Sequence, residues 1–263
     1  MQVTSLGFQT DLALRALEGA EITDRGDYTV VRSPDNPTFW WGNFLLLAGW
    51  PEPGTGDGWL ARFAAEFPQA EHLALGVDAG HEPAQVPPEF LAAGLEFERA
   101  TVLSCAAVQP PPRQNTEAEI RRLESDDDWE QSRDLGIRCY GYGGPYLDRR
   151  AGARRRLTQA GRAAWFGAFT DGRLLSQLGV CDTGGGLARY QDVETDPGGR
   201  RRGLAGTLVW RAGVYAAEAF GAGTLVIVAD PAEEAIRVYR ACGFADAQGQ
   251  FSFERGPTGQ SAG

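Results

Sequence analysis

The segment TDPGGRRRGLAG, residues 195–206, carries the clearest chemical signal in this sequence, and an apolar run follows it directly. The first backbone N–H groups of a helix have no intrahelical acceptor and carry partial positive charge, so a helix start of this kind binds anions. Gly203 and Ala205 leave the backbone bare enough for an anion to touch it, and the arginines add donors. We therefore predict a pyrophosphate site here. Taken alone, the segment also fits a solvated surface turn.

The elements around this segment follow a mixed pattern of strands and helices. Apolar runs and turn residues predict strands at 119–124, 163–170, 174–182, 187–195, 224–230 and 244–255. Helical periodicity and end signals predict helices at 126–139, 147–161, 203–219 and 231–243. Strands that are paired early and then alternate with helices predict an α/β fold whose mixed sheet has a parallel section.

The first half of the chain repeats part of this pattern. We predict strands at 43–50, 72–79 and 98–105 and helices at 58–68 and 87–97. The order matches the closing segment of the second half, which suggests a duplicated architecture whose first copy lacks the arginine–glycine loop. Generic α/β alternation would give the same impression. The proline-rich stretch at 107–119 reads as a stiff, solvated connector, so we predict domains at 1–115 and 116–263.

Composition narrows the class of protein further. With 263 residues, 43% of them hydrophobic, the chain is long and apolar enough to bury a core. No apolar run reaches the ~18 residues of a membrane span, and no leader pattern is seen, so we expect a cytoplasmic protein. The four cysteines are scattered and are expected to be reduced and mostly buried.

The charged residues exclude several function classes. The chain has no lysine and only two histidines, which argues against catalysis or metal binding by a group of histidines. The net charge of −10 argues against general nucleic-acid binding. Arginine is concentrated in the second half of the chain. Residues 1–115 contain 6 arginines and 15 acidic residues, whereas residues 116–263 contain 19 arginines and 20 acidic residues.

Three motifs in the second half resemble the GNAT superfamily of acyl-CoA-dependent N-acetyltransferases. The family's pyrophosphate-loop pattern Q/R-x-x-G-x-G/A is matched by RRRGLA at 200–205. VETDP at 193–197 is similar to its strand end V-x-x-x-P, and AIRVYRACGF at 235–244 is similar to its later A-x-x-x-Y-x-x-x-G-F signature. The resemblance covers residues 116–255, and a weaker resemblance covers residues 20–105. It implies a central mixed sheet flanked by helices and a second, partial copy of this fold at the N-terminus.

The resemblance also implies roles for particular residues. Acetyl-CoA would be the co-substrate, and no metal would be needed. The backbone of the strand end would pair with the pantetheine arm, and the loop would hold the pyrophosphate. The implied cofactor-binding residues are Val193, Glu194, Thr195, Arg200, Arg201, Arg202, Gly203, Leu204, Ala205 and Gly206. Tyr239 would be the general acid, since a phenol of pKa ~10 can protonate a departing thiolate of pKa ~8.5; packing in the core is the alternative for this residue.

The general base is less clearly marked. The position on the next strand where some family members have Glu lies close to Ile227, which cannot accept a proton, and Asp230 stands near the family's frequent Asn. Asp192 and Glu194 alternate onto one face of the preceding strand. Either is a candidate to relay the proton of the amine directly or through water. A solvated acid at a strand end is the alternative for each.

We expect the segment around residues 139–156 to determine which acceptor is bound. Tyr140, Tyr142 and Tyr146 would line a pocket, and the arginines of 149–156 would meet an acidic substrate or the ribose phosphate unless they form a solvated helix face. The aromatic run at 39–44 is expected to pack in a core; the alternatives are that it forms the interface between the halves or closes the acceptor cleft. We thus predict an N-acyltransferase that acts on a small-molecule or peptide amine, with no nucleic-acid or membrane partner. A non-catalytic CoA-binding module with a sensing or scaffolding role is the alternative.

Overall fold

A computed structural model of the chain describes residues 1–141 and 144–256, apart from the side chain of Tyr146. The chain forms two compact units. The first contains Met1–Val102 and the chain from Gln248 onward, and the second contains Leu103–Ala247. The division does not follow the predicted boundary at 115/116, because the proline-rich stretch packs within the second unit and the last strand ends in the first.

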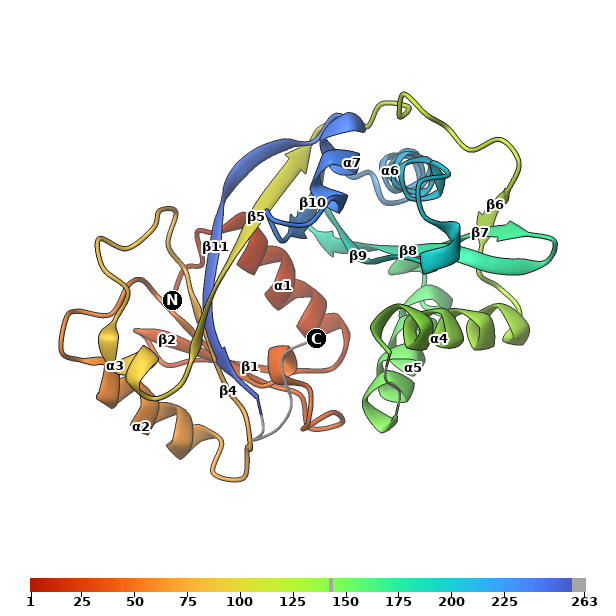
Figure 1. The fold of residues 1–263 in the computed structure, drawn as a ribbon. Helices are drawn as coiled ribbons and strands as arrows, with labels where there is room; N and C mark the ends of the chain where they lie inside the picture. The colour runs from red at the N-terminus through yellow and green to blue at the C-terminus, as the bar shows by residue number, and fades with distance from the viewer. Residues whose placement is uncertain (142–143, 257–263) are drawn as a thin grey trace. The chain divides into compact units, whose positions relative to one another are not determined.

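The first unit combines a mixed sheet with three α-helices in its described residues (Figure 1). Its strands follow the order β1-β2-β3-β4-β11-β5. The β1, β2 and β3 strands are antiparallel neighbours, β3 and β4 are parallel, and β4 and β11 are antiparallel. The elements are α1 (Leu6–Leu17), β1 (Glu21–Asp24), β2 (Tyr28–Arg32), β3 (Phe44–Leu47), α2 (Gly56–Glu66), β4 (Leu73–Val77), α3 (Pro88–Ala92), β5 (Glu96–Cys105) and β11 (Ala245–Arg255).

The aromatic run at 39–44 belongs to the core of this unit, as expected. Phe44 is buried, and the indole of Trp41 donates a hydrogen bond of 2.6 Å to Glu254. Trp40 stacks on the ring of His72. His72 is itself buried against the carbonyl of Asn43, and burial lowers its pKa. These contacts bury apolar surface and give the indole N–H of Trp41 an acceptor, so the run has a packing role.

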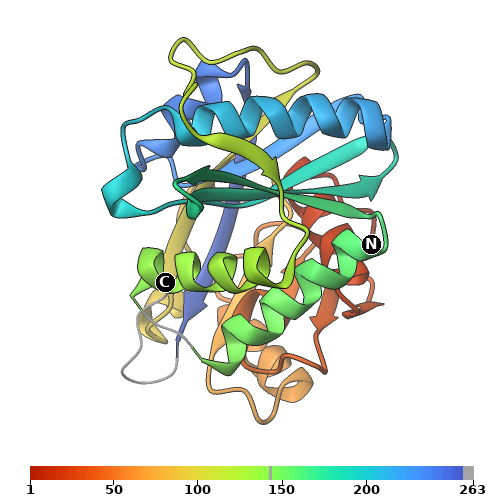
Figure 2. The same cartoon turned by 90° about the vertical axis from the view of Figure 1, so that its right-hand side faces the viewer.

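The second unit is a mixed sheet with helices on both faces. Its strands follow the order β5-β10-β9-β8-β7-β6, antiparallel from β6 to β9 and parallel between β9 and β10. Helices α4 and α5 cover one face, and α6 and α7 cover the other (Figures 1 and 2). The elements are β6 (Glu119–Arg122), α4 (Asp126–Tyr140), α5 (Pro145–Gln159), β7 (Ala163–Thr170), β8 (Arg173–Gly184), β9 (Leu187–Thr195), α6 (Leu204–Phe220), β10 (Thr224–Ala229) and α7 (Ala235–Ala241). The predicted mixed α/β class is confirmed.

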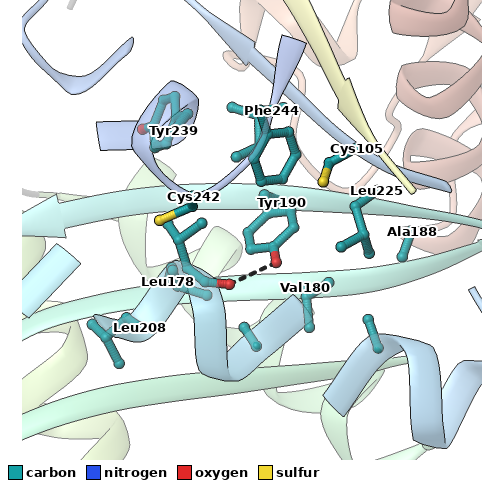
Figure 3. Close-up of a cluster of buried hydrophobic side chains, with 14 of the residues drawn as sticks. Cys105, Leu178, Val180, Ala188, Tyr190, Leu208, Leu225, Tyr239, Cys242 and Phe244 are labelled. Atoms are coloured by element: carbon teal, nitrogen blue, oxygen red, sulfur yellow. Dashed lines mark hydrogen bonds between the residues drawn. The ribbon is translucent and has the colours of Figure 1, made fainter. Parts of the chain in front are cut away.

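A buried cluster fixes α6 and α7 on this sheet (Figure 3). The Tyr190 hydroxyl on β9 donates a hydrogen bond of 2.8 Å to the carbonyl of Val209 on α6. Its ring meets the edge of Phe244, which follows α7, at a centroid distance of 5.7 Å. The side chain of Tyr190 therefore ties three elements together.

In the described part of the chain, no helix has the length and apolar character to cross a membrane.

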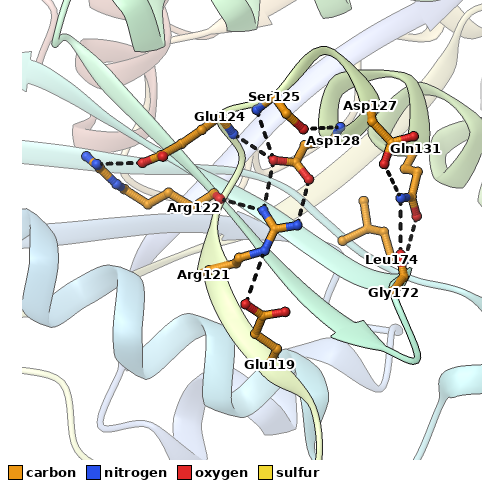
Figure 4. Close-up of polar contacts among 10 residues, drawn as sticks. All are labelled: Glu119, Arg121, Arg122, Glu124, Ser125, Asp127, Asp128, Gln131, Gly172 and Leu174. Carbon is orange, nitrogen blue, oxygen red and sulfur yellow. Dashed lines mark hydrogen bonds and ion pairs between the residues drawn. The ribbon is translucent and has the colours of Figure 1, made fainter.

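A charged cap starts α4 on the opposite face (Figure 4). Ser125 accepts a hydrogen bond from the N–H of Asp128, and the Asp128 carboxylate accepts hydrogen bonds from the N–H groups of Ser125 and Glu124. Arg121 on β6 donates two more, at 2.7 and 2.8 Å. The Arg121 guanidinium and the backbone donors hold the pKa of Asp128 well below its ordinary value. The cap thus joins α4 to the edge strand of the sheet.

Replacing Asp128 by Asn should lower the free energy of unfolding by about 1–3 kcal/mol at pH 7, because buried donors lose a charged acceptor. Stability that comes from a lowered carboxyl pKa is present above the unfolded-state pKa of about 4 and is lost as the pH falls below it. The difference between variant and wild type should therefore shrink at pH 3. Chemical denaturation at both pH values measures it. Asp127→Asn, at an exposed neighbour, is the matched control, and an equal loss at both pH values would contradict the role of the charge.

Candidate active site

Strand β9 separates from its parallel neighbour toward its C-terminal end. Pairing with β10 runs from Leu187 to Arg189, although β9 continues to Thr195. In the described chain, no β10 partner is recorded for the last six residues of β9. One edge of this backbone is therefore open to pair with an extended ligand, as a strand would.

A β-bulge lies within the same stretch. The pairing of β8 with β9 passes from Gly179↔Gln191 to Gln177↔Glu194, so two residues of β9, Asp192 and Val193, face one residue of β8. Asp192 has φ +52°, which lies in the left-handed region. A bulge adds one residue and inverts the alternation of side chains beyond it. As a result, Val193 and Thr195 face the α6 side of the sheet, and the two acidic side chains face α4 and α5.

The arginine-rich loop leads from β9 into the start of α6. Arg201 has φ +61° and Gly203 has φ +79°. The first backbone bond of the helix is donated by Thr207 to the carbonyl of Gly203, at 3.1 Å. The N–H groups of Leu204, Ala205 and Gly206 thus have no intrahelical acceptor. This is the helix start that the sequence predicts, with its amides available to an anion.

The proline-rich stretch contacts this helix start through a few residues, although most of the stretch is exposed, as predicted. The N–H of Asn115 donates to the Thr207 hydroxyl at 2.8 Å, and its side-chain amide donates to the carbonyl of Arg202 at 3.0 Å. A Cβ atom placed on Gly203 would lie 2.6 Å from the carbonyl oxygen of Arg113. Glycine at 203 is therefore required by the connector as well as by its positive φ, a second reason that the sequence did not reveal.

A cleft of about 860 Å³ lies between these segments. Its size is within the ordinary range of small-ligand pockets. Nine of the residues predicted to act line it: Val193, Thr195, Arg200, Arg201, Gly203, Leu204, Ala205, Gly206 and Tyr239. Arg202, Glu194 and Asp192 do not line it. Arg202 contacts the connector instead, through its carbonyl and through an ion pair with Glu117 at 3.6 Å.

Sequence reasoning missed one wall of the cleft. Pro111, Pro112 and Arg113 of the connector line it, as does Arg237 of α7. No local pattern marks the connector residues as ligand-binding, since their position depends on contacts with a helix about 90 residues later in the chain. Asp230 caps the turn before α7, where its carboxylate accepts from the N–H of Ala232 at 2.7 Å, and it does not line the cleft.

Tyr239 lies on α7 at the edge of the buried cluster and lines the cleft (Figure 3). Its side chain is 5% exposed. Burial, with a smaller contribution from Glu233, raises its pKa to about 12. The phenol therefore keeps its proton at neutral pH, as a general acid must before the reaction.

The opposite face of β9 holds the two acidic residues in different environments. Asp192 forms ion pairs with Arg150 at 3.0 Å and Arg154 at 2.9 Å, both on α5. Glu194 is buried, and its Oε2 accepts a hydrogen bond of 2.6 Å from Gln177. Burial and then the nearby charge of Asp192 raise the pKa of Glu194. The charge of Asp192 is thus offset by two arginines, whereas Glu194 has a raised pKa and binds a proton more readily than an ordinary glutamate.

Unsatisfied polar atoms gather around Glu194. Native proteins leave few such atoms without a partner, and each one calls for an explanation such as a water molecule or a ligand. Five buried side chains on this side of the sheet, from the strands or from α4 and α5, each carry an atom with no hydrogen-bond partner among the described residues. These atoms are Ser132 Oγ, Arg154 Nε, Trp165 Nε1, Gln177 Oε1 and Glu194 Oε1. Sequence reasoning did not single out Ser132 or Gln177. This face is therefore polar inside and short of partners, as a site for a polar molecule would be.

The arginines of α5 serve this face and not the cleft. Arg150 and Arg154 pair with Asp192, and Arg155 pairs with Asp126. Helices α5 and α6 lie on opposite faces of the sheet (Figure 2), and no described residue of α5 lines the cleft, so the structure does not support the suggested contact with a ribose phosphate. Of the three tyrosines predicted to line an acceptor pocket, Tyr140 ends α4. Tyr142 and the side chain of Tyr146 lie outside the described residues.

The four cysteines are free, and three of them are buried. Where the structure describes the chain, no group of three or more histidine, cysteine, aspartate or glutamate side chains is placed to hold a metal ion.

Comparison with known proteins agrees with the fold and with the motifs. Residues 126–244 match the model described as the acetyltransferase (GNAT) family, and no curated protein matches the chain. A GCN5-related N-acetyltransferase from Kribbella flavida is 15% identical, with a TM-score of 0.66 and coverage of 97% of this chain and 98% of that one. A functionally unknown conserved protein from Staphylococcus epidermidis is 10% identical, with a TM-score of 0.67 and coverage of 91% and 95%. A tandem GNAT protein from the clavulanic acid biosynthesis pathway is 15% identical, with a TM-score of 0.55 and coverage of 97% and 95%.

Gly203→Ala should destabilise the start of α6 more than Gly221→Ala destabilises its end. Both glycines have positive φ, but a Cβ atom at 221 meets nothing within 4 Å, whereas at 203 it meets the backbone of the connector. We expect losses of about 2–4 and about 1 kcal/mol, respectively, in the free energy of unfolding. Chemical denaturation of both variants provides the comparison. Equal losses would show that only φ matters at Gly203.

Proposed function

Because residues 126–244 match the GNAT acetyltransferase family model, we propose that the protein is a GNAT-type enzyme that transfers an acetyl group from acetyl-CoA to a primary amine. The observation that carries the proposal is the cleft itself. It joins the amides at the start of α6, the open edge of β9 and the phenol of Tyr239. An anion-binding helix start would hold the pyrophosphate, the open strand edge would hold the pantetheine arm, and the phenol would lie near the sulfur.

Each part of the cofactor would have a matching group of residues. The amides between Arg201 and Gly206, with Arg200 and Arg201 beside them, would bind the pyrophosphate. The backbone of β9 from Val193 to Thr195 would pair with the pantetheine amides. This fixed arrangement would place the thioester carbonyl at the gap between β9 and β10, where the strands have separated.

The chemical step would be direct attack of the amine on the thioester. The amine nitrogen forms a bond to the carbonyl carbon, the carbon–sulfur bond breaks, and the products are an amide and free CoA. The nitrogen loses one proton, and the departing thiolate takes one from the hydroxyl of Tyr239. No oxidant, reductant or further co-substrate is needed to balance this reaction.

We assign the base role to Glu194 and a positioning role to Asp192. Glu194 has a carboxylate oxygen without a partner and a raised pKa, so it takes up a proton more readily than an ordinary carboxylate. Asp192 is held by two arginines, and its charge contributes to the shift at Glu194. The acceptor amine would approach from the α4–α5 face, where the unsatisfied polar atoms lie.

The proposal is tested by incubating the protein with acetyl-CoA and a panel of amines while release of free thiol is followed. The panel should span amino acids, polyamines, aminoglycosides and peptides with free N-termini. Wild type should release thiol with at least one class of amine, and Tyr239→Phe should lower the turnover number by about 10²–10⁴-fold while the affinity for CoA changes little. CoA binding without thiol release for any amine would support the non-catalytic module instead.

Tyr190→Phe is the matched control for the tyrosine variant. It removes a hydroxyl from the same buried cluster, but that hydroxyl bonds to the Val209 carbonyl and does not line the cleft. This variant should lose about 1 kcal/mol of stability and keep its turnover number. If Tyr239→Phe lost stability and no activity, its role would be packing alone.

Glu194→Gln should remove an acidic limb from the pH profile of kcat/KM. A base must be deprotonated to act, so the rate should rise with pH through the raised pKa of Glu194, above the ordinary glutamate value near 4.5. Asp192→Asn removes a charge that raises this pKa and leaves two arginines to lower it, so the limb should move to lower pH. Profiles of both variants between pH 5 and 9, with unfolding curves to verify folding, measure these effects. An acidic limb that Glu194→Gln leaves in place would assign the base elsewhere.

A further inference from the structure

Four arginines line the cleft, and no ion pair with another described residue is recorded for any of them. Most arginines of the chain pair with a carboxylate. Among the described residues, no ion pair is recorded for Arg113, Arg200, Arg201 or Arg237, and all four line the cleft. In a protein with a net charge of −10, an unneutralised cationic group at one site points to an anionic ligand.

These arginines come from three separate segments. Arg200 and Arg201 lie in the loop before α6, Arg113 lies in the connector, and Arg237 lies on α7. The connector and α7 approach each other across the start of α6: a Cβ atom on Gly206 would lie 3.1 Å from Pro111 and 3.5 Å from Val238. Arg113 is two residues from Pro111, and Arg237 is next to Val238. The two arginines outside the loop therefore stand on the two sides of one short stretch of cleft.

The charge of CoA matches this distribution. Its pyrophosphate carries about two negative charges, and its ribose 3′-phosphate, a monoester, carries close to two more at neutral pH. The loop amides, the helix start and two loop arginines suffice for the pyrophosphate. The loop alone leaves the 3′-phosphate without cationic partners, and the remaining pair of arginines is in excess of what a pyrophosphate needs.

We propose that Arg113 and Arg237 form a clamp for the ribose 3′-phosphate and make the cleft selective for CoA over its 3′-dephosphorylated form. The inference rests on the proposed function, because it assumes that the pyrophosphate of CoA binds at the start of α6. Arginine suits this role because its guanidinium can donate two parallel hydrogen bonds to one phosphate. The clamp also gives the connector a function, since it brings residue 113 to the cleft.

The acidic residues of the cleft do not cancel the clamp. Glu233 and Glu234 line the same cleft just before α7 begins. Glu233 contributes to the raised pKa of Tyr239, which places its charge near the phenol. Glu233 therefore lies at the Tyr239 end of the cleft, whereas Arg113 lies beside the helix start, where its carbonyl oxygen would be 2.6 Å from a Cβ at Gly203.

The experiment is calorimetric titration of the full chain with CoA and with dephospho-CoA. Wild type should bind dephospho-CoA about tenfold more weakly or worse, as expected for the loss of charge-assisted hydrogen bonds. Arg113→Gln and Arg237→Gln should each weaken CoA binding about threefold to tenfold and leave dephospho-CoA binding almost unchanged. In the double variant the two dissociation constants should become nearly equal.

Two further variants serve as controls. Arg211→Gln removes the same charge from an exposed position on α6 that does not line the cleft, and it should leave the ratio of the two dissociation constants unchanged. Arg113→Lys keeps the charge and should retain part of the selectivity. Thermal unfolding of each variant confirms that it is folded.

The outcomes separate the clamp from the proposed function. Equal wild-type affinity for the two ligands, or an unchanged ratio in the double variant, overturns the clamp and leaves acetyl transfer from CoA intact. If wild type binds neither ligand, the proposed function fails, and the clamp fails with it. A ratio that falls toward one in the double variant but not in Arg211→Gln supports the clamp.

Discussion

The β-bulge at Asp192 and Val193 is the constraint on which the site depends. Before the bulge, Tyr190 points toward α6, where its hydroxyl bonds to Val209. Regular alternation would send residues 192 and 194 to that same face. Two carboxylates would then point toward the cleft, which under the proposed function binds a polyanionic cofactor. The added residue inverts the alternation, so the cleft receives Val193 and Thr195, and the acidic side chains turn to the opposite face.

The bulge also makes the acidic face chemically useful. Asp192 has to be neutralised once it is buried, and Arg150 and Arg154 of α5 do so. Glu194 is buried beside it and has no ion pair recorded among the described residues, so burial and the charge of Asp192 raise its pKa. One strand therefore presents uncharged side chains to the cleft on one face and a carboxylate with raised pKa on the other. Under the proposed function, the thioester and the amine would approach the gap beside β9 from different sides.

Much of the fold could be predicted from sequence because it depends on local patterns. The predicted ranges of β7 and β9 match the observed ones to the residue, and the helix after the arginine loop is shifted by one residue. The helix at 231–243 is shorter than predicted, since the turn capped by Asp230 occupies its first residues and α7 begins at Ala235. The strands at 21–24 and 28–32 were not predicted, because they are short and depend on pairing with β3 for their stability.

The candidate site was predictable only where one short segment supplies it. The loop and Tyr239 lie within motifs, so their place at the cleft could be expected. The residues that sequence missed belong to contacts between segments: Gln177 lies opposite Glu194 on the neighbouring strand, and Arg113 reaches the cleft because Asn115 bonds to Thr207. The connector shows the physical reason. Three prolines make a segment stiff but do not fix what it packs against. That depended on Gly203 and Gly206, whose missing side chains let the connector approach the helix start.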